Sequence, residues 1–157
     1  MEVRVGQGFD VHRFGDDLSR PLVLGGQRFE GLGLVGHSDA DVVAHACADA
    51  LLGAAGLGDI GMLFPDTDPA FAGANSIELL AEVARRVRAE GWEPGNVDCS
   101  VVAEAPKLAP AREAMQARLS AAVGAPVTVK GRRPEALGAL GRGEGIACFA
   151  SAVLTRS

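Results

Sequence analysis

The stretch that decides the fold is GHSDADVVAHACADALLGAAG, residues 36–56. Ser38 or Asp39 is placed to cap a helix there, and Ser38 followed three residues later by Asp41 resembles a capping box in which Asp replaces the usual Glu. The small and apolar residues that follow predict a helix over about 40–55, ended by the glycines beyond it.

Outward from this helix, strand patterns and helix patterns alternate along the chain. Strands are expected at Val3–Gly8, Val97–Ala103, Val127–Lys130 and Ile146–Leu154. The alternation predicts one α/β or α+β domain over residues 1–157. The remaining expected elements are a hairpin through Leu22–Leu24 and Gln27–Phe29, a loop at Gly58–Thr67, a helix at Ser76–Glu90 and a helix from Pro110 to about Val123.

Composition excludes several classes of function. The 157 residues are 48% hydrophobic and 22% charged, as in globular proteins, and no apolar run of about 18 residues predicts a membrane span. The net charge of −5 and the aromatic content of 4% argue against nucleic-acid binding. The N-terminus lacks the pattern of a secretory signal, and the three cysteines are scattered, so we expect a cytoplasmic protein with reduced thiols.

A candidate metal site lies in the N-terminal third. Asp10 and His12 are two residues apart at the end of an expected strand, so both side chains point to the same side. His45 supplies a third ligand from the helix. Two imidazoles and one carboxylate suit Zn²⁺ and leave a fourth position open for substrate or water. Asp49, one turn after His45, is expected to orient that imidazole.

Four motifs together carry a resemblance that covers nearly the whole chain. They are GFDVHRF (8–14), the stretch from Gly36 to Phe71, AEAPKL (103–108) and GRGEGIA (141–147). In order and spacing they resemble the 2-C-methyl-D-erythritol 2,4-cyclodiphosphate synthase family of the non-mevalonate isoprenoid pathway.

The resemblance implies a metal-dependent lyase. Members of the family convert 4-diphosphocytidyl-2-C-methyl-D-erythritol 2-phosphate into the 2,4-cyclodiphosphate and CMP. The 2-phosphate attacks the β-phosphorus, so catalysis needs positioning and charge neutralisation but no side-chain nucleophile. The family uses Zn²⁺ on the β-phosphate and Mg²⁺ or Mn²⁺ between the α- and β-phosphates.

The resemblance also implies an architecture. We expect a mostly four-stranded mixed sheet packed on helices on one face, with a small hairpin. In the family's homotrimer the sheets face inward, and the active sites lie between adjacent subunits. The last strand is compatible, because it is apolar on both alternating sets of residues.

Residue by residue, the family's zinc ligands match Asp10, His12 and His45, and its second-metal carboxylate matches Glu135. His37, paired with Ser38, would donate to the attacking phosphate. The other implied substrate-binding residues are Val11, then Asp59, Ile60, Gly61, Phe64, Pro65, Asp66, Thr67 and Asp68 for methylerythritol, Ala103, Pro106, Lys107, Leu108 and Ala109 for cytidine, and Ala139 and Arg142 towards the threefold axis.

One departure from the family is a Lys-Gly-Arg-Arg-Pro run before Glu135, where threonines are usual. Arg133 stands in place of the threonine that stabilises the transition state, beside Arg132. Three readings remain open. The arginines take over the phosphate contact, the loop binds through its backbone N–H groups, or activity is reduced.

Two alternative functions use the same residues. A zinc hydrolase would need a general base, for which Asp41 or Asp66 is a candidate. A metal-stabilised protein that binds isoprenoid diphosphates without turnover is the other alternative.

Overall fold

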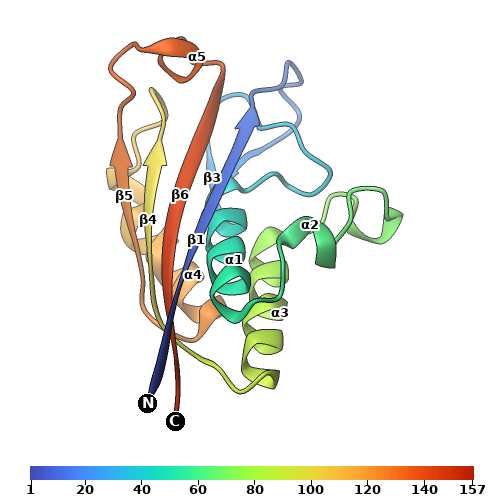
Figure 1. The fold of residues 1–157 in the computed structure, drawn as a ribbon. Helices are drawn as coiled ribbons and strands as arrows, with labels where there is room; N and C mark the ends of the chain where they lie inside the picture. Colours follow the sequence, from blue (N-terminus) through green and yellow to red (C-terminus); the bar gives the residue numbers. More distant parts are fainter.

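The computed structural model describes all residues 1–157 (Figure 1). A mixed four-stranded sheet with the strand order β1-β6-β4-β5 forms its centre. Strands β1 (Glu2–Arg13) and β6 (Gly145–Arg156) pair antiparallel over their whole length. Strand β4 (Glu93–Val102) pairs antiparallel with β6 and parallel with β5 (Val127–Arg132). Strands β1 and β5 are therefore the two opposite edges of the sheet.

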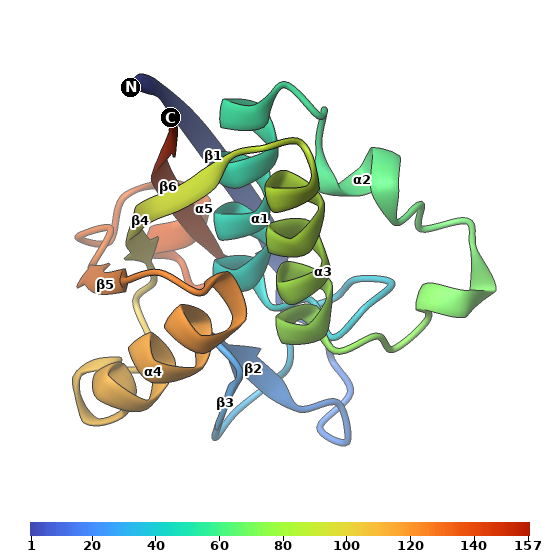
Figure 2. The same cartoon turned by 90° about the horizontal axis from the view of Figure 1, so that it is seen from below.

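Helices cover one face of this sheet (Figure 2). The helices are α1 (Val42–Ala55), α3 (Ser76–Ala89) and α4 (Arg112–Val123), and the hairpin of β2 (Leu22–Leu24) and β3 (Gln27–Phe29) lies beside them. This arrangement confirms the expected fold class. Short helices occur at α2 (Ile60–Leu63) and α5 (Gly138–Gly141), and 3₁₀ turns at Pro69–Phe71 and Ala109–Ala111. None of the helices has the length and apolar character needed to cross a bilayer.

The close approach of α1 to β1 depends on glycine. Gly6 and Gly8 share one face of β1, and a Cβ on either would lie 2.0 Å from a carbonyl oxygen of α1, that of Ala50 or Ala46. The missing side chains let the alanine-rich helix lie directly on the strand. Because side chains alternate along a strand, Asp10 and His12 point to the same face as Gly6 and Gly8. Their side chains therefore lie next to α1, where they meet His45.

Replacing Gly8 with alanine is expected to destabilise the protein by about 3 kcal/mol, because the added methyl group overlaps backbone atoms that cannot move independently. Denaturant unfolding measures this change. Gly53→Ala is a matched control, since its Cβ would meet only a carbonyl oxygen at 3.7 Å, and it should be neutral or stabilising. Equal stabilities for the two variants would contradict this account of the packing.

The start of α1 differs from the sequence prediction. Asp41, rather than Ser38 or Asp39, is the capping residue, and its side chain accepts hydrogen bonds from the Val43 and Ala44 N–H groups. The same buried carboxylate accepts the N–H groups of both glycines in the β2–β3 turn, at 2.9 and 2.7 Å. Asp41 therefore ties the hairpin to the helix, a long-range role that a local capping pattern does not contain.

Other element boundaries also differ from those predicted from the sequence. Strand β1 runs to Arg13, not Gly8, because β6 continues to pair with it, so the predicted ligands Asp10 and His12 lie inside a strand. The expected loop at 58–67 contains α2, and Asp59 caps it through the Met62 N–H. Pro110 lies in a 3₁₀ turn that precedes α4. The predicted hairpin and the predicted start of α3 are confirmed.

The face of the sheet away from the helices is bare in the single chain. Its exposed apolar side chains come from β1 and from β6, where the rings of Phe9 and Phe149 lie 4.9 Å apart. The helices of the chain thus cover one face of the last strand, and the second face would be covered only by another subunit. The exposed residues are Val3, Val5, Phe9, Val11 and Phe149.

Candidate active site

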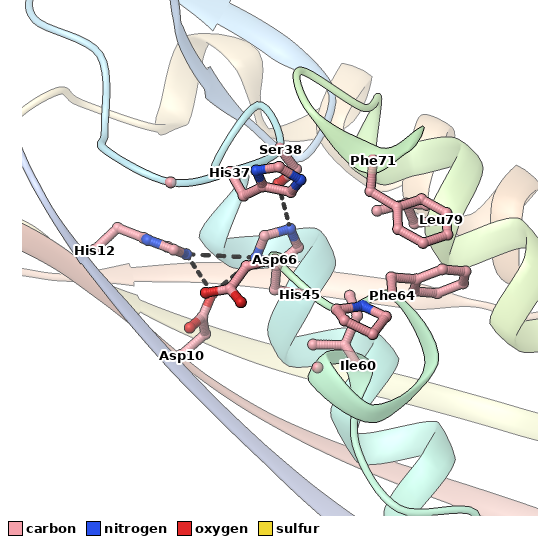
Figure 3. A pocket seen from close by; sticks show the side chains of 13 residues that line it. Asp10, His12, His37, Ser38, His45, Ile60, Phe64, Asp66, Phe71 and Leu79 are labelled. Carbon is pink, nitrogen blue, oxygen red and sulfur yellow. Dashed lines mark hydrogen bonds and ion pairs between the residues drawn. The ribbon is translucent and has the colours of Figure 1, made fainter. Parts of the chain in front are cut away.

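Asp10, His12 and His45 converge on one point (Figure 3). Asp10 Oδ2 lies 2.9 Å from His12 Nε2 and 3.0 Å from His45 Nδ1, and the two nitrogens are 3.4 Å apart. Burial alone would raise the pKa of Asp10, but hydrogen bonds from both rings outweigh it and lower the pKa to about 2. Burial opposes protonation of His12, but the hydrogen bond and charge of Asp10 outweigh it and raise the His12 pKa.

The outward nitrogen of each ring is bonded to the protein. His12 Nδ1 donates to the Val35 carbonyl at 2.8 Å. His45 Nε2 lies 2.7 Å from Ser76 Oγ, whose hydroxyl donates in turn to the Asp39 carboxylate. Ser76 Oγ is thus left to accept from His45. With the outward nitrogens carrying the protons, the inner nitrogens have lone pairs for a metal ion once they give up the protons that they share with Asp10. Two nitrogen lone pairs and a carboxylate fit a divalent metal ion.

The prediction that Asp49 orients His45 is wrong. Asp49 Oδ1 instead accepts the Ile60 N–H at 2.7 Å and holds the start of α2. Helical spacing places Asp49 near His45, but the partners of its outward nitrogen are two hydroxyls. The predicted site residue Ser38 lies 3.2 Å away, and Ser76, which is 31 residues away in the chain and only 1% exposed, lies 2.7 Å away. No local pattern identifies Ser76, because the contact depends on how α3 packs against α1.

Replacing Ser76 with alanine is expected to weaken binding of a divalent metal ion about ten- to a hundredfold, the usual effect of losing the outer hydrogen bond of a ligating histidine. Competition with a metal chelator measures this affinity. Ser120→Ala is the matched control. It removes a hydroxyl on α4, away from the site, that accepts the Val127 N–H of β5. A folded Ser76→Ala protein with unchanged metal affinity would exclude a positioning role.

The metal ligands form the floor of a cleft of about 470 Å³ (Figure 3). His37 lies above them, and its Nε2 donates to the Asp68 carbonyl at 2.7 Å, which fixes the ring. Of the residues expected to bind methylerythritol, the cleft contains Ile60, Gly61, Phe64, Pro65 and Asp66, with Phe71 and Leu79 completing the wall.

A second cleft, of about 430 Å³, lies where β4 and β5 end. Every residue expected to bind cytidine lines it, together with Arg132 and Arg133. Arg133 Nη2 donates to Glu104 at 3.2 Å. The cytidine-binding residues are Ala103, Pro106, Lys107, Leu108 and Ala109.

Several expected site residues line neither of these clefts. Glu135 follows β5, Ala139 lies on α5, and Arg142 donates to Glu144 at 2.5 Å. The others outside both clefts are Val11, on the bare face of β1, and Asp59, Thr67 and Asp68, at and beyond the ends of α2. Asp41, a candidate base for a hydrolase, is fully buried as the helix cap.

The fold and the site define an α+β protein with a candidate divalent-metal site where an edge strand meets a helix. The model of the YgbB family matches residues 3–155, and the chain belongs to that family. It is 52% identical to the 2-C-methyl-D-erythritol 2,4-cyclodiphosphate synthase of Yersinia enterocolitica, over 98% of both chains.

Two other similar proteins are much longer than this chain. A bifunctional IspD/IspF enzyme of Anaeromyxobacter is 54% identical over 98% of this chain, which spans about 40% of that protein's length. Among solved structures, the bifunctional IspDF of Campylobacter jejuni superposes with a TM-score of 0.93 at 46% identity, covering 99% of this chain and 43% of the other. A CDP complex of Plasmodium falciparum IspF superposes with a TM-score of 0.85 at 33% identity, covering 99% of this chain and 97% of the other.

Proposed function

We propose that this chain is a 2-C-methyl-D-erythritol 2,4-cyclodiphosphate synthase. The observation that carries the proposal is the full-length similarity to the Yersinia synthase, in a chain whose three expected zinc ligands converge. In the reaction, an oxygen of the substrate's 2-phosphate bonds to the β-phosphorus. The bond from that phosphorus to the bridging oxygen breaks, and CMP leaves with the electron pair.

We propose Zn²⁺ for Asp10, His12 and His45, and Mg²⁺ or Mn²⁺ for Glu135. One carboxylate is a common protein contribution to Mg²⁺, because the ion takes its other ligands from phosphate and water. The bound cations supply positive charge where negative charge gathers on the phosphate oxygens. His37 is held by Asp68 so that its other nitrogen, when protonated, donates to the attacking phosphate.

We also propose that the active site lies between subunits of a homotrimer. The first cleft uses the edge strand β1 and the second lies beside the opposite edge strand β5, three strand spacings or about 14 Å away. One subunit would supply the metal end and its neighbour the cytidine pocket. The bare apolar face of β1 and β6 supports association of the sheets around an axis.

We also propose that the protein is cytoplasmic. This location is supported by the three cysteines, which are all buried and unpaired, as expected in a reducing compartment.

The proposed activity is tested by incubating the protein with the cytidylyl substrate, Zn²⁺ and Mg²⁺ and following the products by ³¹P NMR. Formation of the cyclic diphosphate with one equivalent of CMP supports the synthase. A hydrolase would give linear phosphates with uptake of water, and a protein that only binds would give neither product. Either of those results overturns the proposal.

A further inference from the structure

Glu104, just after β4, links two segments that form walls of the second cleft. Its Oε1 accepts the Ala136 N–H at 2.8 Å, and its Oε2 accepts Arg133 Nη2 at 3.2 Å. Beside it, the Ala103 N–H donates to the Arg132 carbonyl at 3.0 Å. The Glu104 side chain is only 20% exposed, whereas that of Arg133 is 74% exposed. The carboxylate is therefore the fixed member of the pair.

The segment that Glu104 holds has an unusual backbone. Glu135 and Ala136 have φ values of 55° and 60°, in the left-handed region that non-glycine residues seldom adopt. Such conformations persist where surrounding contacts enforce them. Ala136 is enclosed on a second side by Gly141, where an added Cβ would lie 2.2 Å from the Ala136 carbonyl carbon. The backbone position of Glu135 thus depends on the contacts that its neighbour Ala136 makes with Glu104 and Gly141.

The two adjacent arginines differ in their partners. Arg133 is paired with Glu104, whereas Arg132 and Lys107 line the same cleft without an acidic partner in the chain. The Ala136 N–H and the Arg133 guanidinium together lower the pKa of Glu104, so the carboxylate is charged at neutral pH and neutralises Arg133. The unpaired cations of the cleft are therefore Arg132, Lys107 and Arg112, the first residue of α4.

We infer that Glu104 is a positioning residue that, with Arg133, fixes the segment carrying Glu135, and that Arg132, rather than Arg133, is the one of the two adjacent arginines available to a substrate phosphate. This inference rests on the proposed function. Of the three readings left open by the sequence, it favours a phosphate contact, but from Arg132, while Arg133 stabilises the loop. The arginines that replace the family's threonines then have separate tasks, one structural and one in binding.

The positioning role is tested first by amide hydrogen exchange at Ala136 in the zinc-loaded protein. Glu104→Ala should remove the protection of this amide, and Glu104→Gln should restore part of it, because a glutamine Oε1 still accepts the N–H. Glu93→Ala is the matched control. It breaks a similar pair with Arg88 at the other end of β4, and should leave both the Ala136 amide and turnover unchanged.

Kinetics and ligand binding provide the second test. Glu104→Ala should lower kcat about ten- to a hundredfold, as expected when a reacting group is displaced, and Arg133→Ala should have little further effect in that background. CDP serves as the ligand in calorimetry with Mg²⁺. Arg132→Ala should weaken CDP binding about tenfold through loss of a charged hydrogen bond, and Arg133→Ala clearly less.

Two results would overturn the inference. One is an Ala136 amide whose exchange is unaffected by Glu104→Ala, and the other is a larger loss of CDP affinity from Arg133→Ala than from Arg132→Ala. Neither measurement requires turnover. Failure of the unmodified protein to form CMP would therefore refute the proposed function, while exchange and CDP binding would still decide the role of Glu104.

Discussion

Replacing His45 with alanine is expected to remove bound zinc and to lower CMP formation at least about a thousandfold, because a metal ion supplies several kcal/mol of transition-state stabilisation. The variant leaves Asp10 and His12 as the only ligands, and they are too few to complete a stable site. Zinc content by atomic emission and turnover under substrate saturation measure the two effects.

His37→Ala is the matched control for this experiment. His37 lines the same cleft but is bonded to Asp68 and lies outside the group of ligands. Its variant should keep full zinc content while losing turnover. Full zinc occupancy in folded His45→Ala protein would show that the three residues are not the metal site.

Mixing an inactive His12→Ala chain with an inactive Lys107→Ala chain is expected to restore activity. If each site combines the first cleft of one subunit with the second cleft of its neighbour, every mixed trimer contains one site with neither lesion. Random exchange of subunits then gives about a quarter of the unmodified activity. Turnover is measured after unfolding and refolding the mixture.

The matched control mixes His12→Ala with His45→Ala. Both lesions lie in the first cleft, so every site contains one of them and activity should not return. Absence of recovery in the His12→Ala and Lys107→Ala mixture, once exchange of subunits is demonstrated by mass spectrometry, would place the whole site within one chain.

Much of the site could be predicted because its signals are local. Side chains two apart on a strand share a face, and this placed Asp10 with His12 whatever the strand's exact length. The AEAPKL motif likewise marked residues that line one cleft. Asp49 shows the limit of local reasoning, because it lies one helical turn from His45 but is used to hold the start of α2. Spacing identifies candidates for a contact, whereas packing selects among them.

The sequence by itself determined the class of fold, the hairpin and the three candidate metal ligands, because glycine turns, side-chain alternation and helical periodicity act over a few residues. Tertiary structure decided which distant residues complete the site. Ser76 reaches His45 only through the packing of α3, and Glu104 reaches Arg133 only because β4 and β5 end side by side. Strand order also placed the two clefts at opposite edges. These contacts join residues about 30 positions apart, and their partners are fixed by how whole elements pack.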